Sequence, residues 1–451
     1  MTRPTHTRQD APKPPLSRSH NCARRRCPRV AMQDVSRFPY AVMAAFSSLF
    51  VAFGLLQGAP AEIAKGLCAI ICSSDVLITD YVALGGIGAA FVNAGLLMLA
   101  ATALLWKLGV PFRGLTVAAV FLTGSFGLFG KNIFNVWPVL TGTWLYARVR
   151  GEPFSFHAHT ALFATCLSPV VSEVAFAMPL PPWLGLLLGC LLGVSIGFLI
   201  PPLALHMKAI HMGFSLYNVG FTAGMLGTVY VSLFKSYGYQ IVSRLIWSEG
   251  NNSLFLVFLG TLFGLAILLG LWLTKSPLAE LKGIFSSTGR FESDFIQPYG
   301  FGASLINIGL NGLVATGYVL FVGGPLNGPT IGGILTVAGF GACGKHASNI
   351  LPIFLGVILG GLTKVWSLND PAPLLAALFG TSLAPIAGYY GWAWGVAAGF
   401  INSSVALNSG VLHGGMNLYN TGFSAGIVAA FLVPLMDSLA KRKRPKGARQ
   451  E

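Results

Sequence analysis

Two lysines stand in otherwise apolar stretches, and each is followed four residues later by an asparagine. Residues 130–142 read GKNIFNVWPVLTG and residues 344–356 read GKHASNILPIFLG. An ammonium group attracts an anion, and an amide both donates and accepts hydrogen bonds. These residues therefore predict a path for a small polar or anionic solute, lined by Lys131, Asn135, Lys345 and Asn349.

A second repeated motif carries tyrosine and asparagine. Residues 211–224 read HMGFSLYNVGFTAG, residues 413–426 read HGGMNLYNTGFSAG, and nine of these fourteen positions match. Composition alone would give about one match. The glycines suit close helix packing, and we expect His211 and His413 to begin two helices. The polar side chains either contact the solute or join helices, and the candidates are Tyr217, Asn218, Tyr419 and Asn420.

Glu173 is an acidic residue within an apolar stretch. A carboxyl group inside a membrane is a candidate for proton coupling, and it could equally pair with a lysine. No group of Cys, His and Asp residues has the spacing of a metal site. We therefore expect neither a metal nor a cofactor.

The elements that position these residues must suit a lipid environment. The chain has 451 residues, of which 54% are hydrophobic and 10% charged, whereas soluble domains have about 25% charged residues. The net charge of +15 comes mostly from basic residues near the two ends. Such segments beside membrane spans indicate the cytoplasmic side. We expect lipid and a small solute as partners and no nucleic acid, with a homo-oligomer left open.

Apolar stretches of about 20 residues predict membrane helices. We expect ten, at residues 38–58, 83–106, 160–178, 183–203, 211–234, 253–274, 299–323, 372–389, 391–408 and 413–436. Two longer stretches, 115–147 and 329–362, are interrupted at their lysines. Non-helical backbone at membrane depth is tolerated where it is buried or lines a watery cavity.

The chain is an internal duplication. The lysine motifs are 345 − 131 = 214 residues apart, and Asp80 and Asp294 repeat with the same spacing. The tyrosine motifs are 413 − 211 = 202 residues apart, so a connection is shorter in the second half. Each interrupted stretch either crosses the membrane, which makes the halves parallel, or enters and returns, which makes them inverted.

The charged loops favour inverted halves. Outside the ends and the breaks there are 12 Lys and Arg residues. The inverted arrangement places eight of them in the cytoplasm, namely Lys107, Arg113, Arg148, Arg150, Lys208, Lys275, Lys282 and Arg290. It places four outside, whereas the parallel arrangement reverses the counts. Basic residues favour the cytoplasm.

The sequence thus predicts an all-α polytopic membrane protein with two inverted repeats. Each repeat has about five transmembrane helices and one re-entrant or broken helix. We expect a bacterial inner-membrane location with both termini cytoplasmic, although Met32 is an alternative start to Met1. The predicted parts are a disordered basic tail at 1–36, repeat 1 at 37–245, repeat 2 at 252–440 and a basic tail at 441–451.

This arrangement resembles the urea transporters, which have two inverted five-span halves. FNVWPVLTG and SNILPIFLG are similar to the Asn-Pro pore motif of that family, although here two residues separate Asn from Pro. SLYNVGFTAG and NLYNTGFSAG are similar to its pore-lining helix. Together the repeats look closer to a duplicated bacterial membrane-protein family of unknown function, over nearly the whole chain from about residue 37.

The function predicted from these observations is a channel or facilitator for a small polar or anionic solute. The alternative is a proton- or ion-coupled transporter that uses Glu173. An intramembrane enzyme, or a membrane sensor or assembly protein, represents a further class. We do not expect an enzyme, because paired carboxylates and the motifs HExxH and GxSxG are missing from a suitable context.

Overall fold

The computed structural model describes residues 37–291 and 293–443, and within these ranges the chain forms helices and no strands. The first half contains α1 Arg37–Leu55, α2 Pro60–Ile71, α3 Tyr81–Lys107, α4 Gly114–Phe126, α5 Val136–Arg150, α6 Ala158–Ala164, α7 Pro169–Ser172, a π-helical turn Glu173–Ala177, α8 Pro182–Ile210 and α9 Asn218–Ser236.

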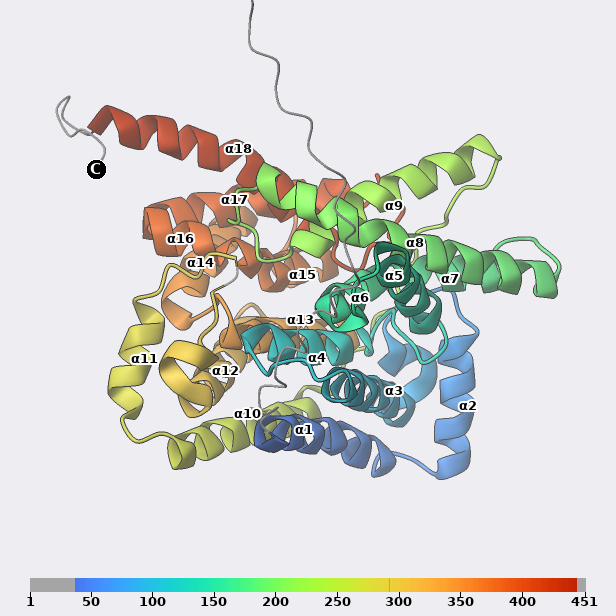
Figure 1. The fold of residues 1–451 in the computed structure, drawn as a ribbon, viewed down its shortest axis with the longest axis horizontal. Helices are drawn as coiled ribbons and strands as arrows, with labels where there is room; N and C mark the ends of the chain where they lie inside the picture. Colours follow the sequence, from blue (N-terminus) through green and yellow to red (C-terminus); the bar gives the residue numbers. More distant parts are fainter. Residues whose placement is uncertain (1–36, 292, 444–451) are drawn as a thin grey trace, which may run out of the picture. The chain divides into compact units, whose positions relative to one another are not determined.

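The second half follows the same order (Figure 1). It contains α10 Asn252–Leu273, α11 Pro277–Phe285, α12 Ile296–Phe321, α13 Gly328–Gly339, α14 Ala347–Thr363, α15 Pro371–Gly380, α16 Ala384–Tyr390, α17 Trp392–Ser409 and α18 Asn420–Lys443. Short 3-10 turns lie at 154–156, 165–167, 340–342 and 381–383. The predicted tail 1–36 and residues 444–451 lie outside the described residues.

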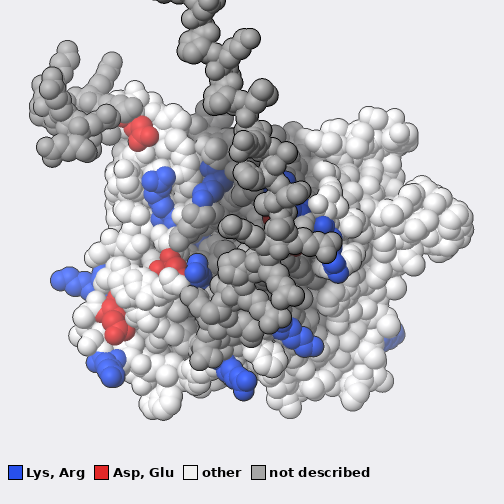
Figure 2. Space-filling model, viewed as in Figure 1, with Lys and Arg blue, Asp and Glu red and all other residues white. Residues whose placement is uncertain are grey.

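The helices confirm an all-α polytopic membrane fold. Among the described residues seven helices are long and apolar enough to cross a membrane, or eight if the bent segment 158–177 is one span. Large apolar side chains point away from the protein, such as Leu191 on α8 and Leu268 on α10, which are 55% and 64% exposed. Such faces suit lipid contact. Lys and Arg are more frequent than Asp and Glu on the face in Figure 2.

Equivalent residues shape the two halves in the same way. Helices α3 and α12 each contain one kink, at Gly86 and Gly300, with φ of 84° and 85°. Only glycine adopts this backbone conformation readily. Asp80 accepts hydrogen bonds from the amides of Val82 and of Gly328. The two equivalent bonds in the second half run from Ile296 and Gly114 to Asp294, so each carboxylate caps the short helix of the other half.

Helices α4 and α13 lie side by side and run antiparallel (Figure 1). Gly328, at the start of α13, faces the carbonyl of Leu128 just after α4, whereas Gly339 at its end faces Phe121. The Ser125 hydroxyl donates to the carbonyl of Gly332 at 2.6 Å. This pair joins the halves, because each member follows the long kinked helix of its own half.

The start of α4 and the end of α5 lie close to the same segment of chain. Thr116 on α4 is hydrogen-bonded to His159 on α6 at 3.1 Å. The ring of Tyr146, late in α5, packs on His157 at 5.3 Å. The chain therefore returns after the break at Lys131 towards the level from which α4 began.

Candidate functional site

Each break is a glycine turn closed by an asparagine. Gly130 and Gly344 have φ of 122° and 91°, a region that favours glycine. The side-chain amide of Asn135 donates to the carbonyl of Gly130 at 3.0 Å, and Asn349 does the same to Gly344 at 2.9 Å. Both predicted site residues therefore hold the turns that position the lysines.

The two lysines are completely buried. The Lys131 ammonium donates to the Leu162 carbonyl at 3.4 Å. The Lys345 ammonium donates to the Tyr217 hydroxyl at 2.5 Å and to the Thr381 hydroxyl at 2.8 Å. Neither lysine forms an ion pair with a described carboxylate. Burying an unpaired charge is costly, and membrane residues of this kind mark functional sites.

Aromatic rings face both ammonium groups. Lys131 lies 5.1 Å from the ring centre of Phe126, and Lys345 lies 5.2 Å from that of Phe340 and 4.7 Å from that of Tyr217. Phe126 and Phe340 are equivalent, since 340 − 126 = 214. A ring face attracts a cation, so the rings supply part of the stabilisation that a carboxylate would give.

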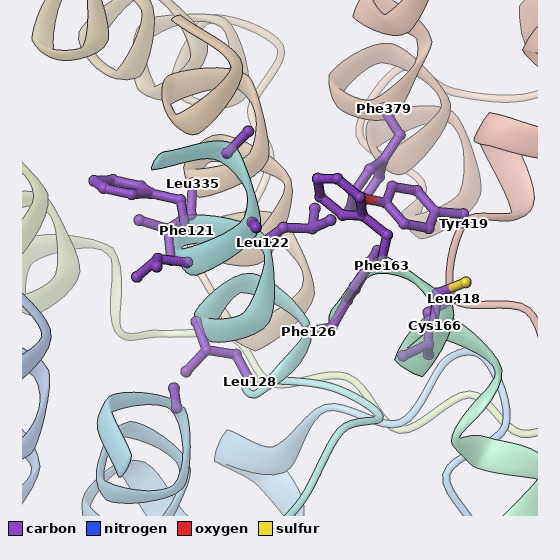
Figure 3. Close-up of a cluster of buried hydrophobic side chains, with 14 of the residues drawn as sticks. Phe121, Leu122, Phe126, Leu128, Phe163, Cys166, Leu335, Phe379, Leu418 and Tyr419 are labelled. Carbon is purple, nitrogen blue, oxygen red and sulfur yellow. The ribbon is translucent and has the colours of Figure 1, made fainter. Parts of the chain in front are cut away.

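The rings join into one layer at the centre of the described unit. The Tyr217 and Tyr419 rings are 4.9 Å apart, Phe126 lies 4.8 Å from Tyr419, and Phe340 lies 5.0 Å from Tyr217. Figure 3 shows Phe126, Phe163, Phe379 and Tyr419 close together, although they come from separate elements. We call Tyr217, Tyr419, Phe126 and Phe340 the aromatic layer. The layer stands between the surroundings of the two lysines.

Two cavities approach this layer. Vestibule 1 has a volume of about 610 Å³ and is lined by residues that include His159, Phe163, Ala204, Leu216, Asn218 and Cys343. Vestibule 2 has a volume of about 550 Å³ and is lined by residues that include Leu375, Phe379, Ala406, Leu418, Asn420 and Phe129. These sets are equivalent position by position, since 375 − 159 = 216, 406 − 204 = 202 and 343 − 129 = 214.

The asparagines of the tyrosine motifs line the vestibules, and each anchors a helix end. The side-chain oxygen of Asn218 accepts a hydrogen bond from His211 at 3.0 Å, and its side-chain nitrogen donates to the carbonyl of Ala204 at 2.9 Å. Asn420 makes the same two contacts, with His413 and Ala406. The prediction that the histidines begin these helices is wrong. Both lie in the preceding turn, because glycines with positive φ interrupt the helix there.

Glu173 lines neither vestibule. Its carboxylate accepts hydrogen bonds from the hydroxyls of Ser74 and of Tyr239, the latter at 2.6 Å. It borders another hollow, and Arg244 lines both this hollow and vestibule 2. The proposed role in proton coupling remains a prediction, and the structure does not bring Glu173 to Lys131 or Lys345.

Asp75 is an acidic residue that sequence reasoning missed. Its carboxylate is fully buried and accepts from Tyr81 at 2.6 Å, Asn132 at 2.9 Å and Asn135 at 3.0 Å. It therefore braces the first break. The repeat could not reveal it, because the equivalent position is Gly289. In the described ranges no group of three His, Cys, Asp or Glu residues is placed to hold a metal.

The fold and the site define a polytopic helical membrane protein with an internal duplication. The profile of the family described as "Protein of unknown function (DUF1576)" matches the chain in two segments, residues 59–236 and 273–438. The chain belongs to this family, which confirms the prediction of a duplicated family of unknown function. No curated protein and no solved structure matches the chain.

Proposed function

We propose that this protein conducts a small polar or anionic solute across a membrane, from one vestibule past the aromatic layer to the other. The observation that carries this proposal is the pair of vestibules. Equivalent residues of the two halves line them. Vestibule 1 reaches Tyr217 and Tyr419, and vestibule 2 extends to Leu418, the neighbour of Tyr419 in the chain. Paired broken helices at a repeat interface are a common setting for substrate paths.

The vestibules open on opposite membrane faces if the halves are inverted. A two-fold axis that relates antiparallel helices is perpendicular to them, and α4 and α13 are antiparallel. If these helices follow the membrane normal, the axis lies in the membrane plane, as in inverted repeats. The contacts of Thr116 and Tyr146 with the α6 region support re-entrant α4–α5 hairpins.

The two lysines indicate which charge of solute the path favours. Two buried ammonium groups without a described carboxylate partner create a positive potential near the layer. At about 4 Å and an effective dielectric constant near 20, one unit charge attracts another with roughly 4 kcal/mol. Anions and neutral amides are therefore favoured over cations. We propose transport rather than an enzymatic activity, in a bacterial inner membrane with vestibule 1 facing the cytoplasm.

Flux measurements test this proposal. The double variant Lys131→Met/Lys345→Met removes both charges and keeps much of the side-chain length. We expect anion flux into liposomes to fall at least about tenfold, which is about 1.4 kcal/mol. Nitrate, formate and chloride are the anionic probes, and urea and acetamide the neutral ones. Lys107→Met is the control, because Lys107 is exposed at the end of α3.

The single variants should each give a smaller loss than the double variant. For a neutral solute, changes at Asn218 and Asn420 should reduce flux more than changes at the lysines. A folded double variant that moves every probe at the wild-type rate would refute the role of the lysines. Wild-type protein that moves none of the probes would contradict the proposed solute class.

A further inference from the structure

At the aromatic layer, equivalent residues of the two halves make different contacts. Many other bonds recur in pairs, such as those of Asn218 and Asn420 with their histidines. At the layer Lys345 donates to the Tyr217 hydroxyl. Both Lys131 and Tyr419 are described, yet no hydrogen bond joins them, and the Lys131 ammonium instead contacts the Leu162 carbonyl.

The threonines beside the lysines differ in the same way. Thr381 accepts a hydrogen bond from Lys345 at 2.8 Å. Its equivalent is Thr165, since 381 − 165 = 216. Both threonines donate to the carbonyl three residues earlier at 2.6 Å, Thr165 to Leu162 and Thr381 to Leu378, but Thr165 has no bond with Lys131. The ammonium of the second half is therefore held by two hydroxyls, and that of the first half by one long contact to a carbonyl.

The two vestibules also differ in whether they reach the tyrosines. Vestibule 1 reaches both tyrosines and Gly220. Vestibule 2 ends at Leu418, Phe129 and Phe379, and neither tyrosine lines it. The deeper vestibule is thus the one beside the Lys345–Tyr217 bond, so the tyrosine pair is reached from one side only.

We propose that the protein is a carrier that exposes the tyrosine pair to one side of the membrane at a time. The structure is the state open through vestibule 1. In the second state the two halves exchange roles. Lys131 is hydrogen-bonded to Tyr419, the bond between Lys345 and Tyr217 is broken, and vestibule 2 is open to the aromatic layer. Because the two halves have equivalent residues at these positions, either arrangement is available to the same chain. This mechanism rests on the proposed transport function and replaces a permanently open pore with alternating access.

Thiol accessibility tests the mechanism without knowledge of the solute. Val219 lines vestibule 1 and Thr421 lines vestibule 2, and they are equivalent, since 421 − 219 = 202. Each is changed to cysteine in protein whose own cysteines are replaced. A sulfonated, membrane-impermeant maleimide then reports the labelling rate on each side, and Tyr217→Phe and Tyr419→Phe form the matched pair of variants.

Tyr217→Phe removes the hydroxyl that accepts from Lys345 and keeps the ring. Loss of a hydrogen bond to a charged group from one state shifts the equilibrium between the two states by about tenfold or more. We expect the ratio of Val219→Cys to Thr421→Cys labelling to fall about tenfold in this variant. Tyr419→Phe should leave the ratio unchanged or raise it, because the Tyr419 hydroxyl makes no bond to Lys131 in this state.

Equal changes of the ratio in both tyrosine variants, or no change in either, would overturn the carrier mechanism. If replacement of the native cysteines prevents folding, the labelling rate of native Cys343 is measured instead, because Cys343 lines vestibule 1. This rate should fall in Tyr217→Phe and not in Tyr419→Phe. The predicted labelling pattern in protein that transports no probe would contradict the proposed function and leave the two-state mechanism standing.

Discussion

The two breaks have the same backbone turn, and the two halves hold it by different means. In the first half the carboxylate of Asp75 binds Asn132 and Asn135. In the second half Gly289 occupies the equivalent position, and a side chain there would come within 2.1 Å of the Gly344 carbonyl. A buried acid and a close backbone contact thus stabilise equivalent turns, which shows that the duplication kept the geometry and changed the contacts.

The largest expected effect concerns this difference. Asp75→Ala removes the acceptor of the Tyr81 hydroxyl and one acceptor of each of the Asn132 and Asn135 side-chain amides. Each unsatisfied buried group costs about 1–3 kcal/mol, so we expect the free energy of unfolding to fall by about 3 kcal/mol or more. Thermal unfolding in detergent micelles measures it, with Asp75→Asn as the control that retains one acceptor oxygen. Wild-type stability of Asp75→Ala would show that the acid does not hold the break.

A smaller difference is expected between two equivalent asparagines. Asn93 donates to the carbonyls of Gly127 and Lys131, and Asn307 donates to those of Gly341 and Lys345. The Lys345 carbonyl also accepts from Asn311 at 3.0 Å, whereas Leu97 is the equivalent of Asn311.

Because the second break has this additional donor, Asn93→Ala should destabilise the protein more than Asn307→Ala. We expect losses of about 2 and about 1 kcal/mol in the free energy of unfolding. Chemical denaturation of both variants in one detergent measures the difference. A larger loss for Asn307→Ala would contradict the comparison.

The smallest expected difference in stability is between alanine variants at Gly86 and Gly300. Their φ and ψ angles agree within about 1°, and a side chain at either would meet no atom within 4 Å. Alanine at each should therefore cost only the backbone strain, about 1–3 kcal/mol. Equal shifts of the melting temperature for Gly86→Ala and Gly300→Ala are expected. Clearly unequal shifts would show that the kinks have different surroundings in the folded protein.

Most of the long helices and both breaks could be predicted, because an apolar run and its interruption depend on residues close in the chain. The helices α2 and α11 were not predicted, and seven or eight of the described helices are long and apolar enough to cross a membrane, against the ten spans expected. The start of α9 was placed too early, since Met212 and Gly213 adopt positive φ and delay the helix to Asn218. The vestibules and the Lys345–Tyr217 bond could not be predicted. They depend on packing between residues more than 100 positions apart, and the repeat alone would have paired both lysines alike.

The asparagines illustrate a second limit. Asn135 and Asn349 were predicted to contact solute because of their spacing from the lysines. In the structure both bind the backbone of their own turns. Spacing identifies residues that act together, and it does not tell whether an amide faces a cavity or the chain.

The central claim is that the halves are inverted, so that the breaks belong to opposite membrane faces. The most direct measurement is the labelling of Arg150→Cys and Asp370→Cys, two exposed positions after the first and second hairpins, in otherwise cysteine-free protein in intact cells. A membrane-impermeant maleimide should label Asp370→Cys from outside and reach Arg150→Cys only after permeabilisation. Labelling of both from the same side would contradict the inverted arrangement, and with it the path from vestibule 1 to vestibule 2.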